Sequence, residues 1–164
     1  MPGLDIRVGL GFDIHRLAPG RRLVLAGVEV PSDSGPVAHS DGDVVLHAVA
    51  DAILGAAGLG DLGDHFPDTE AAWKDADSAR ILAGAVTLAR EAGWRPAQAD
   101  VNVLLERPKL AALKDRMQKR LAELLAIEPS AVGLKARTME GLGPVGEGRA
   151  VAAQAVVVLE RKRE

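Results

Sequence analysis

The chain has 164 residues, 48% of them hydrophobic and 26% charged, and its formal net charge is −3. These values are typical of one soluble globular domain, which we predict to span residues 1–164, and they argue against a nucleic-acid-binding protein. No apolar run reaches the roughly 18 residues of a membrane-spanning helix, and the N-terminal segment lacks the pattern of a secretory signal peptide, so we expect a cytoplasmic protein without a membrane partner.

The first half of the chain begins with predicted strands over residues 5–12 and 23–30. In both, Val is frequent, and apolar residues either alternate with other residues or follow one another directly. Residues 41–58 follow helical spacing, with Ser40 as the expected N-cap and glycines at the end. Residues 59–76 are rich in Gly, Asp and Pro and are predicted to form a long loop. The remaining predicted elements are a helix over 77–92, a strand over 99–105, a helix over 109–126, and strands over 132–138 and 149–160.

The order of these elements predicts an α/β (α+β) fold, a two-layer sandwich in which a mixed sheet of four or five strands carries helices on one face. The last predicted strand is apolar on both faces, which indicates a central position in the sheet. A single layer of helices leaves the other face of the sheet uncovered. We therefore expect that face to be buried by self-association.

The chain contains no cysteine, so any metal must be held by His, Asp or Glu. Asp13 and His15 are two residues apart on a predicted strand and can point the same way, and His47 on the next helix could supply a third ligand. Three such ligands with an open fourth position are typical of catalytic zinc. Asp43 and Asp51 have helical spacing to His47, so one of them could orient its ring. The alternative is a set of ordinary polar side chains.

Three other motifs could bind a ligand. The loop over residues 60–68 could approach an anion or a sugar, or it could be a surface loop with Asx-turns. Residues 135–140 combine Lys, Arg, Thr and Glu at a strand end, which suits phosphate and a hard cation but also suits solvated surface. Two G-x-G-x-x-G matches, at 58–63 and 141–146, are rejected as dinucleotide sites because neither has a strand before it and a helix after it.

Together, the motifs GFDIH, AHSDGDVVLHAVADAILGAAGLGDLGDHFPDT, DADS, ERPKL and KARTMEGLG resemble the 2-C-methyl-D-erythritol 2,4-cyclodiphosphate synthase family over roughly residues 6–160. The resemblance implies conversion of 4-diphosphocytidyl-2-C-methyl-D-erythritol 2-phosphate into the 2,4-cyclodiphosphate and CMP, in the non-mevalonate route to isoprenoids. It also implies a homotrimer whose sheets face the trimer core and whose active sites lie between adjacent subunits.

The resemblance implies roles for individual residues. One zinc-type ion per subunit would be held by Asp13, His15 and His47, and Mg²⁺ or Mn²⁺ at the substrate diphosphate would lie near Glu140. His39 and Thr138 would be catalytic by positioning phosphates and stabilising the transition state. The implied contacts to the CDP-linked substrate are Ser40, Asp61, Leu62, Gly63, Phe66, Pro67, Asp68, Thr69, Glu70, Leu105, Glu106, Arg107, Pro108, Lys109, Leu110, Ala111, Arg137, Thr138, Met139 and Glu140.

The chain departs from the family pattern near its C-terminal turn. Arg137 and Met139 stand where the family often has Thr, and Pro144 stands where it often has an aromatic residue. Glu147 and Arg149 exchange the two charges of the usual G-R-G-E, and we expect them to keep an ion pair near the trimer axis, with the partners reversed. Two other functions fit the same motifs: a phosphoesterase that uses zinc-bound water, and a non-catalytic trimer that binds a nucleotide or an isoprenoid diphosphate.

Overall fold

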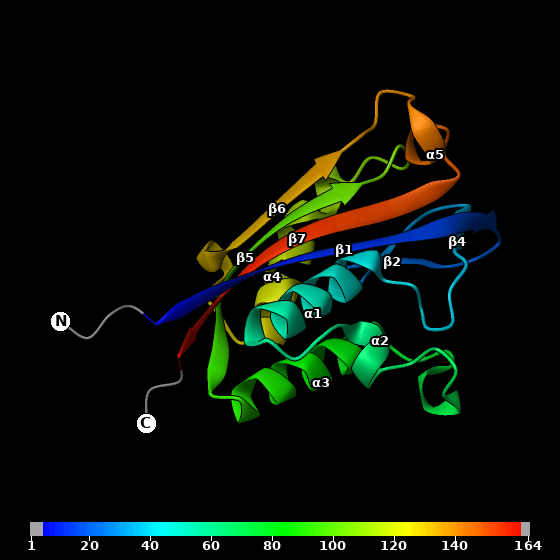
Figure 1. Cartoon of the computed structure of the whole chain (residues 1–164). Helices are drawn as coiled ribbons and strands as arrows, with labels where there is room; N and C mark the ends of the chain where they lie inside the picture. Colours follow the sequence, from blue (N-terminus) through cyan, green and yellow to red (C-terminus); the bar gives the residue numbers. More distant parts are fainter. Residues whose placement is uncertain (1–4, 162–164) are drawn as a thin grey trace.

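The fold is a five-stranded sheet with a layer of helices on one face, seen in a computed structural model that describes residues 5–161 (Figure 1). The strands are β1 (Ile6–Pro19), β2 (Leu23–Leu25), β3 (Val28–Val30), β4 (Ser34–Pro36), β5 (Trp94–Leu104), β6 (Val132–Arg137) and β7 (Ala150–Arg161). The helices are α1 (Val44–Ala57), α2 (Leu62–His65), α3 (Ser78–Glu91), α4 (Lys114–Leu125) and α5 (Gly143–Gly146), with short 3-10 turns at Ala71–Trp73, Ala111–Leu113 and Pro129–Ala131.

The sheet has the strand order β4-β1-β7-β5-β6, and it is mixed because β5 and β6 are parallel while the other neighbours are antiparallel. The predicted fold class, with helices on one face of a mixed sheet, is therefore confirmed. The predicted central position of the last strand is confirmed as well, since β7 lies between β1 and β5. In the described part of the chain, no helix is long and apolar enough to span a membrane.

Two glycines of β1 let α1 lie directly on the strand. A Cβ atom on Gly9 would meet the carbonyl oxygen of Ala52 at 1.9 Å, and one on Gly11 would meet that of Ala48 at 1.8 Å. No side chain fits at either position unless the helix backbone moves. The close approach brings the end of β1 beside the first turns of α1, where the candidate metal ligands lie.

The predicted single strand over residues 23–30 is wrong, because these residues form the hairpin β2–β3. The two central residues of the hairpin turn, Ala26 and Gly27, have positive φ angles of 52° and 70°, as a type I′ turn requires. The turn is held from outside, since the Asp43 carboxylate accepts hydrogen bonds from the backbone N–H groups of Ala26 (3.0 Å) and Gly27 (2.7 Å).

Other boundaries also differ from the prediction. The N-cap of α1 is Asp43 and not Ser40, so the helix begins at Val44. The predicted loop over 59–76 includes α2 and a 3-10 turn. β5 begins at Trp94, five residues early, because a bulge between Pro96 and Gln98 accommodates the proline in the strand.

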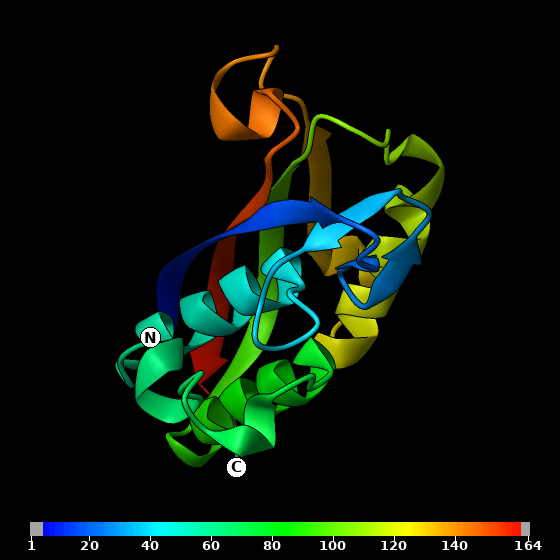
Figure 2. The same cartoon turned by 90° about the vertical axis from the view of Figure 1, so that its right-hand side faces the viewer.

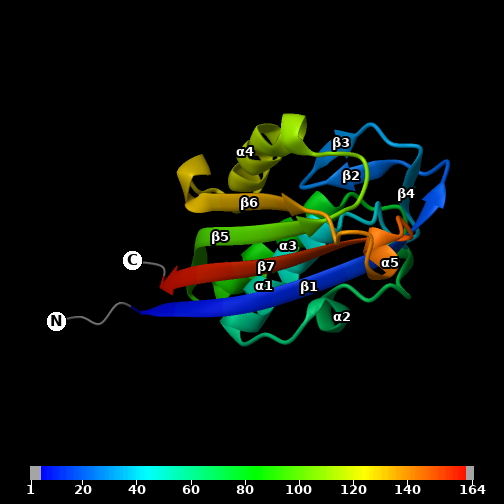
Figure 3. The ribbon, with the colours of Figure 1, turned by 90° about the horizontal axis from the view of Figure 1, so that it is seen from above.

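The face of the sheet opposite α1 and α3 is apolar and uncovered over β1 (Figure 3). Alternate residues of β1 point to this face, and their exposed fractions range from 45% to 72%. They are Ile6, Val8, Leu10, Phe12 and Ile14. Helix α5 lies near one end of this face, away from the helix layer (Figure 2). The other alternate residues of β1 point toward α1, so one strand serves both faces.

We predict that Gly9→Ala lowers the free energy of unfolding by about 3 kcal/mol, because the added methyl group would overlap the carbonyl oxygen of Ala52. Gly55→Ala is the matched control: nothing lies within 4 Å of its added methyl group, which should stabilise α1 by about 0.5–1 kcal/mol. Urea unfolding at one protein concentration measures both changes. Equal stability of the two variants would contradict the close packing of β1 on α1.

Candidate active site

Three side chains from β1 and α1 meet at one point. The Oδ2 atom of Asp13 lies 3.0 Å from His15 Nε2 and 3.0 Å from His47 Nδ1, and the two ring nitrogens are 3.4 Å apart. Asp13 and His15 point to the same side of β1 because they are two residues apart. His47 reaches them from α1. It directly precedes Ala48, whose carbonyl oxygen lies against Gly11 of β1.

The dimensions of this triangle suit a metal ion. In a tetrahedral site with metal–ligand bonds of about 2.0–2.1 Å, ligand atoms lie about 3.3 Å from one another. The three observed distances are 3.0, 3.0 and 3.4 Å, and every pair of candidate ligand atoms is within 4.8 Å. Asp13, His15 and His47 could therefore hold a divalent ion and leave a coordination position open for a ligand.

The electrostatics of the three residues favour a bound cation. Burial disfavours the Asp13 carboxylate, but hydrogen bonds and charge interactions with His15 and His47 outweigh burial and lower the pKa of Asp13. Burial likewise opposes protonation of His47, yet Asp13 raises the pKa of that ring. A carboxylate held ionised between two imidazoles is ready to act as a metal ligand.

One of Asp43 and Asp51 was expected to orient the His47 ring, but the hydrogen bonds of both carboxylates go elsewhere. Asp43 instead caps α1 and holds the β2–β3 turn, and burial raises its pKa to about 6. Asp51 accepts a hydrogen bond from the backbone N–H of Leu62 at 3.2 Å, and burial raises its pKa. The Nε2 atom of His47 lies near two hydroxyl groups, 2.9 Å from Ser78 Oγ and 3.2 Å from Ser40 Oγ.

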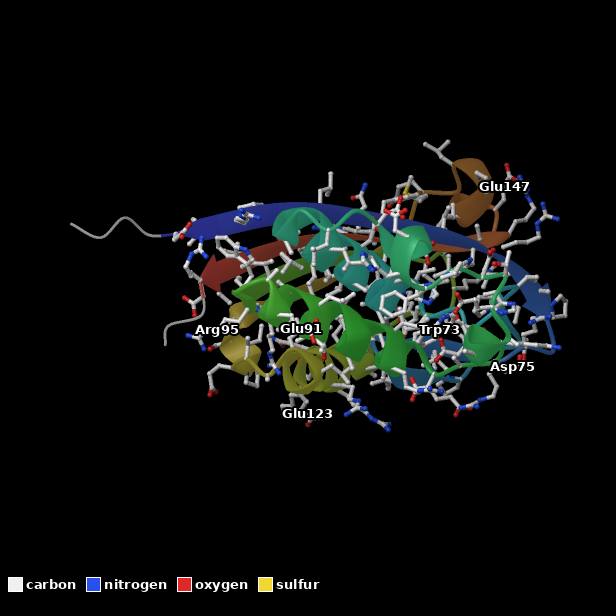
Figure 4. The ribbon with its side chains drawn as sticks, turned by 60° about the horizontal axis from the view of Figure 1, so that its bottom comes forward. Trp73, Asp75, Glu91, Arg95, Glu123 and Glu147 are labelled. Atoms are coloured by element: carbon white, nitrogen blue, oxygen red, sulfur yellow. The ribbon has the colours of Figure 1, made fainter. Side chains whose placement is uncertain are left out.

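A cavity of about 580 Å³ opens beside the three candidate ligands. Its wall comes from the loop before α1, from α2, and from the loop between α2 and α3, where Figure 4 shows Trp73 and Asp75. The lining residues among those named from the sequence are Asp13, His15, His39, Ser40, His47, Leu62, Gly63, Phe66, Pro67, Asp68 and Thr69. The first and last of these residues, Asp13 and Thr69, are 56 positions apart in the sequence, and the fold gathers the whole set around one cavity.

Four further lining residues were not predicted: Val37, Ala38, Trp73 and Ile81. Trp73 packs edge-on against Phe66, with ring centroids 5.1 Å apart and an interplanar angle of 84°. Apolar side chains of this kind look like core residues in a sequence, so only the position of Trp73 in an acid-rich loop could have indicated a pocket.

Two of the remaining predicted residues lie beside the cavity without lining it. Asp61 is the N-cap of α2 and exchanges capping-box hydrogen bonds with Asp64. Glu70 contributes its backbone, since its carbonyl oxygen lies 3.2 Å from His39 Nε2. Both therefore shape the loop that surrounds the cavity.

The other predicted substrate residues form a second cluster, where the parallel strands β5 and β6 end. Glu106 Oε2 accepts from the backbone N–H of Met139 at 3.0 Å, and Thr138 Oγ1 donates to Glu140 Oε1 at 3.1 Å. The segments 105–111 and 137–140 are thus tied together but do not line the 580 Å³ cavity. Within one chain, the predicted site is divided between two places.

The C-terminal turn that departs from the family pattern lies beside the second cluster. Arg149 Nε donates to Glu147 Oε2 at 2.7 Å, so the predicted ion pair is present within the chain. Both side chains are largely exposed, and such pairs contribute little to stability. Figure 4 shows Glu147 across the sheet from Trp73.

Comparison with known proteins identifies the class. The model of the YgbB family matches residues 6–160, and the chain belongs to this family. A relative from Salinibacter ruber (strain DSM 13855 / M31), named 2-C-methyl-D-erythritol 2,4-cyclodiphosphate synthase, is 54% identical over 155 residues, which cover 94% of this chain and 99% of the relative. The resemblance inferred from the sequence motifs is confirmed.

Solved structures agree with this assignment. A 2C-methyl-D-erythritol-2,4-cyclodiphosphate synthase with CDP bound has a TM-score of 0.87 and 41% identity, and the match covers 93% of this chain and 99% of that one. The bifunctional IspDF from Campylobacter jejuni has a TM-score of 0.92 and 41% identity, over 98% of this chain and 43% of that chain.

We predict that the chain binds Zn²⁺, used as the probe ion, at one site, and that His47→Ala weakens this binding at least 100-fold because one of three ligands is lost. His65→Ala is the matched control, since His65 lies in α2, outside the three-residue site, and bonds to the carbonyl oxygen of Leu59. Competition with a chromophoric chelator gives both dissociation constants. Equal affinities for the two variants would contradict the three-residue site.

Proposed function

We propose that the chain converts 4-diphosphocytidyl-2-C-methyl-D-erythritol 2-phosphate into 2-C-methyl-D-erythritol 2,4-cyclodiphosphate and CMP. The observation that carries the proposal is the triangle of Asp13, His15 and His47 at the wall of the cavity. The names of the curated relatives and the CDP bound to a structure with the same fold support it. A CDP-linked small molecule is therefore the proposed substrate.

The reaction needs positioning more than proton transfer. The substrate's own 2-phosphate is the nucleophile, and it is already anionic near neutral pH, so no general base is required. It attacks the β-phosphorus, a P–O bond forms, and the bond to the CMP phosphate breaks with its electron pair leaving on CMP. Because the attack is intramolecular, correct folding of the substrate can contribute up to roughly 7–11 kcal/mol.

The proposed residue roles follow from this chemistry. His39 and Ser40 line the cavity next to the three candidate ligands, where they can hold phosphate oxygens. Leu62, Gly63 and residues 66–69 of the wall can enclose the methylerythritol part. Zn²⁺ at Asp13, His15 and His47, and Mg²⁺ or Mn²⁺ near Glu140, would supply positive charge to the reacting phosphates. Thr138 and Arg137 would bind the diphosphate, and residues 105–111 would recognise cytosine.

We infer that the active site is completed by a second copy of the chain, within a homotrimer. Two observations support this inference. The second cluster of predicted substrate residues does not line the cavity of its own chain. The open sheet face also carries five apolar residues of β1 with exposed fractions of 45% or more, and exposed apolar patches can mark protein–protein interfaces.

Incubation of the protein with the proposed substrate, Zn²⁺ and Mg²⁺, followed by phosphorus NMR, should show CMP and a cyclic diphosphate. His47→Ala should reduce turnover at least 1,000-fold without loss of fold by circular dichroism, because the change removes a ligand and leaves the core intact. A linear product together with CMP would instead support a phosphoesterase. Bound metal without turnover would support a binding protein.

Light scattering should give the mass of three chains for the parent protein. Leu10→Asp should lower the mass to that of one chain, since Leu10 is 72% exposed in the middle of the open face and a carboxylate there would be buried on association. A monomeric mass for the parent protein would contradict both the trimer and an active site between subunits.

A further inference from the structure

The loop before α1 and the loop before α3 are hydrogen-bonded to each other directly behind the candidate metal site. Asp41 donates its backbone N–H to the carbonyl oxygen of Ala76 at 3.1 Å, and Asp75 donates its own to that of His39 at 2.8 Å. Ser78, the first residue of α3, is fully buried at this junction. It is the last residue of the DADS motif, residues 75–78.

The Ser78 hydroxyl connects a carboxylate to a candidate metal ligand. Its Oγ atom lies 2.9 Å from His47 Nε2, and it donates to Asp41 Oδ1. The other carboxylate oxygen of Asp41 accepts from the backbone N–H of Ser78 at 3.1 Å, so the two residues are fixed to each other by two hydrogen bonds. The hydroxyl therefore has a settled donor direction, and its lone pairs face His47.

The orientation of the His47 ring decides which of its two nitrogens can face a metal ion. The Nδ1 atom is the one beside Asp13 and His15. A neutral imidazole that offers the lone pair of Nδ1 carries its proton on Nε2 and must donate it to an acceptor. The Ser78 hydroxyl is such an acceptor, and Asp41 behind it makes it a better one.

Ser40 is the other hydroxyl near His47, and it is less suited to this role. Its Oγ atom is 3.2 Å from Nε2 and already accepts the backbone N–H of Gly42. It also lines the cavity, where a ligand can reach it, whereas Ser78 does not. The shorter contact, the complete burial and the carboxylate partner all favour Ser78 as the acceptor.

We propose that Ser78, supported by Asp41, is a positioning residue of the metal site that accepts the Nε2 proton of His47 and so fixes the ring with Nδ1 toward Asp13 and His15. The inference rests on the proposed metal site and not on the reaction catalysed there. Hydrogen-bond partners of this kind behind a metal-bound histidine typically change metal affinity 10- to 100-fold.

The test compares Ser78→Ala with Ser40→Ala, which removes the other hydroxyl group near the same nitrogen. Competition with a chromophoric chelator should show Zn²⁺ affinity 10- to 100-fold weaker in Ser78→Ala and within about threefold of the parent in Ser40→Ala. Ser78→Thr, which keeps the hydroxyl, should bind more tightly than Ser78→Ala. Equal affinity of Ser78→Ala and the parent would overturn the proposal, as would equal loss in the two alanine variants.

A spectroscopic measurement on the zinc-loaded parent needs no variant to fold. The Nε2 proton of His47 should give a downfield proton resonance that exchanges slowly with solvent, because its acceptor is buried. Fast exchange would overturn the proposal. If the parent and His47→Ala bind Zn²⁺ equally, the metal site itself is refuted, which is a different outcome from equal binding by the parent and Ser78→Ala.

Discussion

The close contact between β1 and α1 is the constraint on which the candidate site depends. Gly9 and Gly11 have no side chain, so the helix backbone lies against the strand at Ala52 and Ala48. Asp13 and His15 follow on the same side of β1, and His47 precedes Ala48 on α1. A larger residue at either glycine would push the helix away and separate ligand atoms that are now 3.0–3.4 Å apart.

The two-residue period of β1 joins this site to the opposite face of the sheet. Odd-numbered residues supply the glycine contacts and two candidate ligands, and the intervening residues, from Ile6 to Ile14, supply the apolar surface. A shift of one residue in the pairing of β1 with β7 would exchange the two sets. If the open face is the trimer interface, correct register of this one strand is needed for both the metal site and assembly.

Much of the fold could be predicted because the main elements carry strong local patterns. The apolar β7 predicts its own central position, and the i, i+2 spacing of Asp13 and His15 predicts that they converge. The β2–β3 hairpin could not be predicted, since Ala26 has no turn preference and its positive φ is stabilised by Asp43, 17 residues away. The same carboxylate was one of two candidates to orient His47, and it caps α1 instead, because helical spacing alone cannot distinguish a capping residue from a helical one.

Ser78 shows why the outer part of a site is harder to predict than its ligands. A serine at the start of a helix usually serves that helix, and nothing near it in sequence indicates that its hydroxyl faces His47, 31 residues earlier. Here Asp77 caps α3, which leaves the Ser78 hydroxyl free for Asp41 and His47. Asp77 thus caps the helix, and the adjacent Ser78 contacts Asp41 and His47. The contacts of Ser78 form only in the folded chain, where the loops before α1 and α3 lie together.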